Sequence, residues 1–276
     1  MVGPNPKREA AVYVAKKHSV SASRACRVLG LARSTFDYKE HPRDDSPVVD
    51  ALKDLAENNK RFGHPRLFLL LKRDKGIFVN HKRSERIYQS LKLQIKNRKR
   101  KKLGGETRKV QPLIPYGVGD VLAIDFVFDY LVSGRRLKTL TMVDEKAKIS
   151  PALLVAHSIR GIHLGPFIEL ACEKLPRVIR VDQGTEFTSR AFLDWAYRKN
   201  IHLEFTRVRK PNQVIESFNS RFRDECLNEH LFYDLDDAKE KINEWHDRYN
   251  NHNPHSSLGM MTPNEFAEKN ETMLLA

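Results

Sequence analysis

Cysteine is scarce in this sequence, and its spacing excludes two kinds of small scaffold. The 276 residues contain three cysteines, Cys26, Cys172 and Cys226, which lie far apart and form no C-x-x-C pair. A disulfide framework or a cysteine zinc site needs several closely spaced cysteines, so neither is expected. Scattered thiols are typical of a reducing compartment, and we therefore expect a cytoplasmic protein.

Long apolar runs and nucleotide-binding motifs are missing as well. No stretch approaches the roughly 18 apolar residues that span a bilayer. The first ten residues, MVGPNPKREA, contain no apolar segment of the kind found in secretory signals. The sequence also shows no Gly-rich nucleotide loop, no nucleophilic triad and no His/Cys cluster with zinc spacing. An apolar content of 40% is ordinary and predicts a folded, globular chain.

Charge is abundant and unevenly distributed. The chain carries 49 Lys and Arg against 35 Asp and Glu, a formal net charge of +14. Residues 1–113 hold 28 basic and 11 acidic side chains, whereas residues 114–276 hold 21 and 24. The basic surplus thus lies entirely in the first two fifths of the chain. This asymmetry predicts a polyanion-binding N-terminal part and a C-terminal part with a different task.

The N-terminal part reads as short helices. Apolar spacing predicts a helix over 8–18, and a second helix follows Ser21 and ends at Gly30. A third begins at Arg33, with Ser34 and Thr35 in its first turn. This order is typical of a helix-turn-helix DNA-binding module over residues 1–45, although a plain three-helix bundle has the same pattern. We predict that Arg33, Ser34 and Thr35 contact DNA.

A second basic helical module is predicted over residues 46–95. Helices are expected at 46–58, 65–73 and 81–91, and the last presents Lys82, Arg83 and Arg86 as candidate DNA contacts. Residues 96–113 form a basic linker that is either simply solvated or lies along the phosphate backbone. Its candidate DNA-binding residues are Arg98, Lys99, Arg100, Lys101 and Lys102.

Residues 114–276 change to an α/β pattern. Strands are expected at 121–129, 137–143, 152–156, 178–181 and 201–205, and a hairpin turn at Ser133-Gly134 joins the first two. Helices are expected at 166–174 and 189–199, from about Val214, and at 235–249. A strand meander followed by α/β alternation predicts a mixed sheet with helices on both faces.

Three acidic residues occupy unusual places in this domain. Asp125 interrupts an apolar strand, where a carboxylate is costly unless it is paired, binds a cation or faces water from an edge strand. Asp182 closes the strand VIRVD, either as a simple turn or as a functional group at a strand end. Glu216 points away from the apolar stripe Val214, Phe218 and Phe222, and an exposed first-turn Glu is also favoured by the helix dipole. Together, the three could supply the oxygen ligands of a two-magnesium site.

Four longer motifs carry a family resemblance. IDFVFD, RVDQGTEFTSR, IESFNSRFRDECLNEH and NPHSSLGMMTP resemble the catalytic core of bacterial insertion-sequence transposases, specifically the second-reading-frame (OrfB-type) proteins with a retroviral-integrase-like core. RACRVLGLARSTF and VNHKRSERIY resemble the helix-turn-helix region of the same family. The resemblance covers nearly the whole chain. It implies a ribonuclease-H-like mixed sheet with flanking helices, preceded by all-α modules.

The resemblance also implies a function. It assigns Asp125, Asp182 and Glu216 as the catalytic, metal-binding acids and Arg223 as a contact to terminal DNA. The implied activity is Mg²⁺-dependent cleavage of a phosphodiester and 3′-hydroxyl strand transfer at the ends of an insertion sequence, with Mn²⁺ as a substitute ion. Double-stranded DNA, a second copy of the chain and a first-frame protein are the implied partners, and a nucleoid-associated bacterial location follows.

One departure leaves an alternative open. Residues 183–215 separate Asp182 from Glu216, an interval two residues shorter than the family commonly has. If the loop before Val214 absorbs the shortening, Glu216 still reaches the other acids. If the helix begins late or is rotated, the chain is a catalytically decayed DNA-binding remnant or a regulator of transposition.

Overall fold

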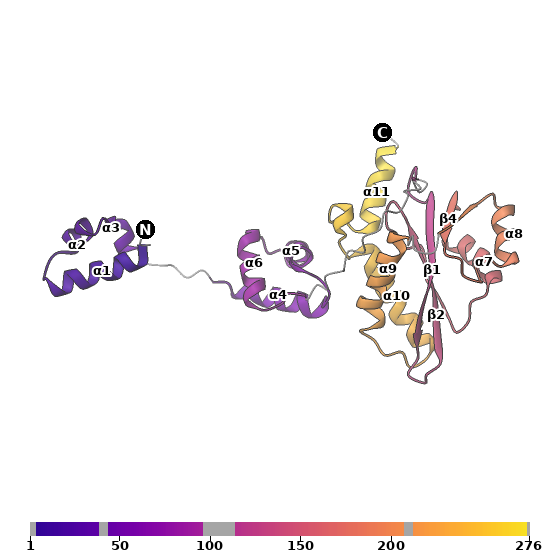
Figure 1. The fold of residues 1–276 in the computed structure, drawn as a ribbon, viewed down its shortest axis with the longest axis horizontal. Helices are drawn as coiled ribbons and strands as arrows, with labels where there is room; N and C mark the ends of the chain where they lie inside the picture. The colour runs from indigo at the N-terminus through magenta and orange to yellow at the C-terminus, as the bar shows by residue number, and fades with distance from the viewer. Residues whose placement is uncertain (1–3, 39–43, 96–113, 207–211, 275–276) are drawn as a thin grey trace, which may run out of the picture. The chain divides into compact units, whose positions relative to one another are not determined.

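The computed structural model describes residues 4–38, 44–95, 114–206 and 212–274, and it falls into two compact units, residues 1–47 and 48–276 (Figure 1). The basic segment from Arg98 to Lys102 lies outside the described residues. No helix among the described residues is long and apolar enough to cross a membrane.

The first unit is a set of three short helices. They are α1 (Pro4–Lys17), α2 (Ala22–Val28) and α3 (Arg33–Asp37). Ser21 caps α2 as predicted, since its hydroxyl accepts a hydrogen bond from the backbone N–H of Arg24 at 3.4 Å. Gly30 adopts a φ of +60°, which lets the chain turn sharply between α2 and α3. The small apolar core of this unit consists of Ala11, Ala25, Cys26 and Leu31.

The second unit begins with three more helices. They are α4 (Ser46–Asn58), α5 (His64–Arg73) and α6 (His81–Ser90), each within one residue of its predicted bounds. The side chain of Asn80 caps α6 by accepting from the N–H of Lys82 at 2.9 Å. These helices enclose an apolar cluster of their own, which contains Leu52, Leu67 and Leu71 among its fully buried side chains.

A five-stranded mixed sheet follows, in the order β3-β2-β1-β4-β5. β1, β2 and β3 are antiparallel neighbours, whereas β4 and β5 run parallel to β1. This arrangement confirms the predicted mixed α/β sheet with a ribonuclease-H-like order. The strands are β1 (Val121–Tyr130), β2 (Arg136–Asp144), β3 (Leu154–Ala156), β4 (Val178–Val181) and β5 (His202–Phe205).

Helices cover both faces of the sheet (Figure 1). α9 (Gln213–Phe222) and α10 (Leu235–Asn251) pack on the face that carries Ala123 and Val127. α7 (Gly161–Ala171) and α8 (Arg190–Arg198) pack on the face that carries Leu122 and Ile124. The predicted alternation of β1 side chains between the two faces is therefore confirmed. The remaining elements are the π-helical turn η1 (Arg223–Leu227), the 3₁₀ turn η2 (Ser256–Leu258) and α11 (Pro263–Leu274).

The bounds of one predicted helix in this domain need correction, and one helix was not predicted. α7 begins at Gly161 rather than near Pro166, and the proline lies inside the helix. The two glycines of α7 permit close packing on α8 and its N-cap, because a Cβ on Gly161 would lie 1.8 Å from the Ser189 hydroxyl and one on Gly165 2.5 Å from the Trp195 ring. α11, which follows the 3₁₀ turn, was not predicted at all.

Candidate functional site

Asp125 lies on the central strand of the sheet. β1 has β2 on one side and β4 on the other, so the alternative of a water-facing edge strand is wrong. The side chain is half-buried and points to the face covered by α9. Its Oδ1 accepts from the N–H of Phe126 at 2.7 Å, and its Oδ2 accepts from Nδ2 of Asn219 at 2.8 Å. Asp125 is thereby held by a side chain of α9.

Thr141 and Asn219 form hydrogen bonds with Asp125 and with each other, and the sequence analysis did not single them out. Thr141 is the β2 residue directly opposite Asp125. Its hydroxyl lies 2.8 Å from Oδ1 of Asn219 and 3.1 Å from the Asp125 carbonyl oxygen. An available signal was spacing, because Asn219 follows Glu216 by three positions and shares its helix face.

Asp182 lies immediately after β4, as predicted. Its side chain is exposed, and its Oδ1 accepts from the N–H of Gly184 at 2.9 Å. A Cβ at position 184 would lie 2.9 Å from the same oxygen, so glycine leaves room for the carboxylate. Arg180 and Asp182 alternate with Val181, and the strand register pairs Arg180 with Ala123. Asp182 therefore follows a strand whose alternate residues point to the same face as Asp125.

Glu216 lies in the first turn of α9 and is exposed. The helix buries Ile215, Phe218 and Phe222, and the partly buried Val214 packs against the same cluster, so the predicted stripe faces the core and Ile215 adds to it. Glu216 itself points away from this stripe, as expected. The helix begins at Gln213, directly after the N-cap Asn212, so it does not begin late.

The charges of Asp182 and Glu216 act on Asp125. The pKa of Asp125 is raised to about 6 because burial and the negative charges of Asp182 and Glu216 together outweigh the hydrogen bonds from Phe126 and Asn219. Within the described residues, none of the three forms an ion pair with Lys, Arg or His. This part of the sheet therefore carries uncompensated negative charge.

The donor chemistry of this cluster fits a hard divalent cation. Carboxylate oxygens are the ligands that Mg²⁺ prefers, and a raised carboxyl pKa marks a place where positive charge would be stabilising. Over the described residues, however, no three His, Cys, Asp or Glu side chains are already grouped as a metal-holding set. Asp182 and Glu216 thus lie near enough to raise the pKa of Asp125, but the three acids are not grouped as a set of metal ligands.

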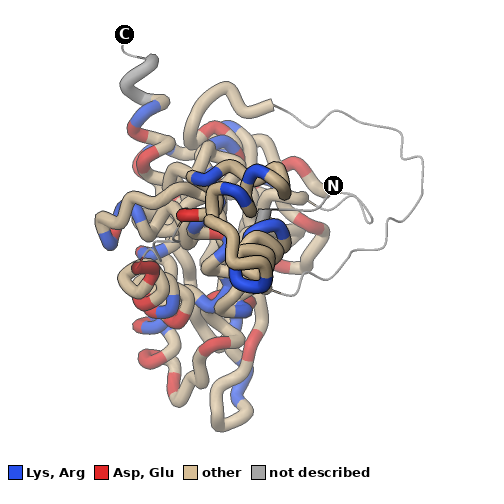
Figure 2. The backbone as a smooth tube through the Cα atoms, turned by 90° about the vertical axis from the view of Figure 1, so that its left-hand side faces the viewer, with Lys and Arg blue, Asp and Glu red and all other residues tan. Residues whose placement is uncertain are grey.

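The candidate DNA-binding residues lie on separate helices. Arg33, Ser34 and Thr35 form the first turn of α3, and Arg33 pairs with Asp37 at 3.5 Å. Lys82 and Arg86 are exposed on α6, whereas Arg83 is half-buried. Figure 2 marks the positions of Lys and Arg along the described backbone.

Arg223 directly follows α9 at the start of the π-helical turn. It is exposed, and its Nη2 lies 3.5 Å from the Phe128 carbonyl oxygen of β1. This position places a positive charge directly after the helix that carries Glu216 and beside the strand that carries Asp125.

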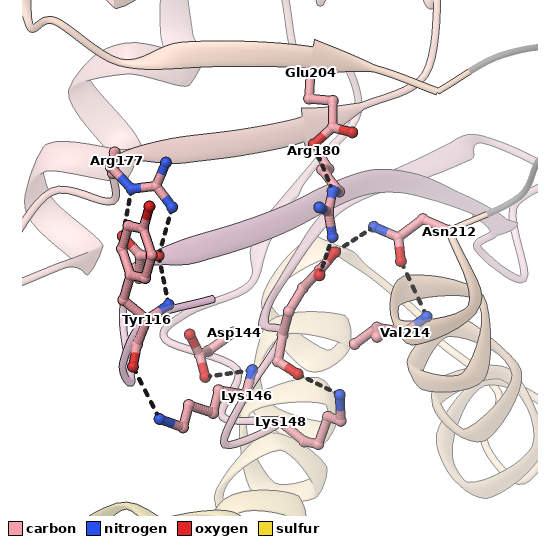
Figure 3. Close-up of polar contacts among 11 residues, drawn as sticks. Tyr116, Asp144, Lys146, Lys148, Arg177, Arg180, Glu204, Asn212 and Val214 are labelled. Atoms are coloured by element: carbon pink, nitrogen blue, oxygen red, sulfur yellow. Dashed lines mark hydrogen bonds and ion pairs between the residues drawn. The ribbon is translucent and has the colours of Figure 1, made fainter. Parts of the chain in front are cut away.

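A buried polar network lies at the start of α9 (Figure 3). Arg180 of β4 donates to carboxylate oxygens of Glu145 and, at 2.8 Å, of Glu204 on β5. Glu145 also accepts from Nδ2 of Asn212 at 2.9 Å, and Asn212 in turn accepts from the N–H of Val214 at 3.0 Å. None of these residues was predicted, because their contacts depend on the strand register.

Comparison with known families defines the class of this domain. Two models described as "Integrase core domain" match the chain, over residues 115–211 and 199–263. Among solved structures, the magnesium complex of the HTLV-2 integrase catalytic core in its trimeric form aligns with 16% identity and a TM-score of 0.46. That alignment covers 56% of this chain and 99% of the HTLV-2 chain. Residues 115–263 thus match the integrase core models.

Curated relatives extend the likeness to the whole chain. The 31.7 kDa protein of insertion element IS407 from Burkholderia multivorans is 41% identical over 93% of this chain and 94% of its own length. The 39.2 kDa protein of IS476 from Xanthomonas euvesicatoria is 39% identical over 98% and 79%. The putative transposase InsK of IS150 from Escherichia coli is 26% identical over 90% and 93%. This chain belongs to the family of insertion-sequence transposases with an integrase-like core.

Proposed function

We propose that the protein is a DNA transposase that cleaves a phosphodiester at the end of an insertion sequence and joins the freed 3′-hydroxyl to a second phosphodiester. The observation that supports this most is the electrostatic effect of Asp182 and Glu216 on the pKa of Asp125. Asp125 lies on β1, Asp182 directly follows β4 and Glu216 lies in the first turn of α9. The charges of Asp182 and Glu216 help to raise the pKa of Asp125, and none of the three forms an ion pair among the described residues.

In this proposal, the three carboxylates hold Mg²⁺, or Mn²⁺ in its place. The ions would supply Lewis-acid activation of the attacking oxygen and neutralise charge that develops on the leaving oxygen. Asn219 and Thr141 orient the Asp125 carboxylate, and Arg223 contributes a positive charge for a DNA phosphate. The attack occurs directly at phosphorus, so no covalent link between protein and DNA forms.

DNA recognition is proposed for the N-terminal helices. The first turn of α3 and the exposed face of α6 carry the candidate contacts Arg33, Ser34, Thr35, Lys82, Arg83 and Arg86. The segment Arg98 to Lys102 adds phosphate contacts between the proposed modules 46–95 and 114–276. Because both ends of an element must be joined, we propose that the protein acts as a homo-oligomer on double-stranded DNA. A first-frame protein is a further proposed partner, and a nucleoid-associated cytoplasmic location follows from DNA binding.

A strand-transfer assay on element-end DNA with Mg²⁺ tests this function. We expect the intact protein to join DNA, and chelation of the metal to abolish joining. Asp125→Asn and Glu216→Gln are each expected to abolish joining while DNA binding persists. Binding without joining by the unaltered protein would instead identify a decayed or regulatory DNA-binding protein, and joining that survives either substitution would reject the assigned residues.

A further inference from the structure

Glu216 can meet Asp125 and Asp182 only if α9 begins at a fixed place. Glu216 lies on α9, which packs on the sheet through apolar side chains such as Ile215 and Phe218. Apolar packing fixes which face is buried, but it allows small sliding along the helix axis because it is not directional. A directional contact at the start of the helix would remove that freedom.

The polar network around Arg180 supplies such a contact. Asn212 caps α9 through its side-chain oxygen and donates its amide to Glu145, so the first turn is tied to the residue that directly follows β2. Glu145 is fixed in turn, since its backbone N–H bonds the Val121 carbonyl oxygen at 3.0 Å and its carboxylate receives Arg180. The start of α9 is thereby connected to β1, β2 and β4 at once.

The spacing of polar contacts along α9 supports the same role. Asn212 bonds Glu145, and Asn219 bonds Asp125 at 2.8 Å. These two asparagines are seven residues apart, which is two helical turns, and therefore lie on one helix face. Glu216 lies between them on that face. The helix is thus tied to the sheet by hydrogen bonds on either side of the third acid.

The burial of Arg180 and Glu145 indicates that their ion pair does more than stabilise the fold. The side chains of Arg180 and Glu145 are only 8% and 7% exposed. Buried ion pairs are often no more stabilising than apolar residues of the same size, because desolvation offsets the attraction. What the charges add is directionality, since a guanidinium offers several N–H groups in a fixed plane and can bridge Glu145 and Glu204 together.

We infer that Arg180, Glu145 and Asn212 are positioning residues that set the start of α9 and so hold Glu216 beside Asp125. This inference rests on the proposed function for its catalytic consequence, but the positioning itself is independent of activity.

Two substitutions test the positioning in the full-length protein. Asn212→Ser retains a side-chain oxygen for capping but removes the amide that reaches Glu145. Arg180→Lys keeps the positive charge but cannot bridge two carboxylates with a planar fork. Arg177→Lys is the matched control. Arg177 directly precedes the same strand and bonds Asp120 with two nitrogens at 2.9 Å, and neither residue hydrogen-bonds to α9 among the described residues.

Hydrogen exchange and metal titration provide the two readouts. We expect Asn212→Ser and Arg180→Lys to speed amide exchange of residues 213–218 about tenfold, because each variant loses a hydrogen bond to a charged group. Both should raise by a similar factor the Mn²⁺ concentration that gives half-maximal calorimetric binding, while Arg177→Lys changes neither. Wild-type exchange in both variants, or the same effect from Arg177→Lys, would overturn the inference. If the unaltered protein binds no metal, the proposed function fails, and the exchange measurement still decides the positioning.

Discussion

At the residue scale, Asp125 is the most informative side chain. It is a half-buried carboxylate on the central strand, and its pKa is raised to about 6 by burial and by two neighbouring acids. A carboxyl group in an unfolded chain has a pKa of about 4. The folded protein therefore holds this proton more tightly than the unfolded chain does, and ionisation of Asp125 in the metal-free protein opposes folding.

We predict that Asp125→Asn stabilises the metal-free protein at pH 7.5 by about 1–2 kcal/mol. The wild-type contribution is fully present below pH 4 and is lost as the pH rises to about 6, so the advantage of the variant should disappear at pH 4. Urea unfolding at several pH values measures the difference. Asp129→Asn, on the same strand and face, is the control, and an advantage that does not change with pH would contradict the assignment.

Asn219 provides a second test at this scale. Its amide stabilises the ionised form of Asp125, so Asn219→Ala should raise the pKa of Asp125 above 6. Carbon-13 NMR of the aspartate carboxyl groups measures this titration. Ser220→Ala, an exposed position on the same helix, should leave the titration unchanged. An unaltered Asp125 titration in Asn219→Ala would show that the hydrogen bond is not made in solution.

At the element scale, periodicity predicted much of the architecture but not its fine contacts. The alternation along residues 121–129 correctly placed Asp125 on one face, and the spacing of Phe218 and Phe222 correctly turned Glu216 outward. Such patterns can be predicted because they depend only on residues that are close in sequence. The role of Arg180 was not predictable, because it depends on which strand lies opposite and where a helix begins. The spacing of Asn219 from Glu216 indicated its helix face but not its bond to Asp125. The start of α7 at Gly161 was not predicted either.

The contact between α7 and α8 yields a prediction about stability. A Cβ at position 165 would lie 2.5 Å from the ring of the buried Trp195, whose Nε1 is held by a hydrogen bond to Glu169 at 2.6 Å. Gly165→Ala should therefore destabilise the protein by about 1–3 kcal/mol, measured by urea unfolding. Leu170→Ala, at a position 85% exposed on the same helix, should change stability far less. Equal stability of Gly165→Ala and wild type would show that the two helices are less tightly packed than described.

At the scale of the whole molecule, charge and chemistry are divided along the chain. The basic surplus lies in residues 1–113, and the coupled acids lie in the integrase core. This division was evident from sequence alone, because net charge is a sum over residues and needs no coordinates. The same holds for the family, whose motifs extend over nearly the whole chain.

The division predicts how DNA binding responds to salt. The affinity of the intact protein for DNA should fall steeply with ionic strength, since each phosphate contact adds about 0.9 to the logarithmic slope. Replacing Lys82 and Arg86 together by Gln should reduce the slope measurably in fluorescence-anisotropy titrations. Lys239→Gln on α10, where the lysine pairs with Asp236, is the control and should not alter it. A flat salt dependence of the intact protein would remove the case for phosphate binding by the N-terminal part.

The most direct measurement of the proposed site is calorimetric titration of Mn²⁺ into the intact protein bound to element-end DNA. We predict saturable binding by the unaltered protein, and a loss of most of the heat in each of Asp125→Asn, Asp182→Asn and Glu216→Gln, because all three carboxylates serve one site. Binding by Glu216→Gln that matches the unaltered protein would show that the helical acid does not join the two strand acids.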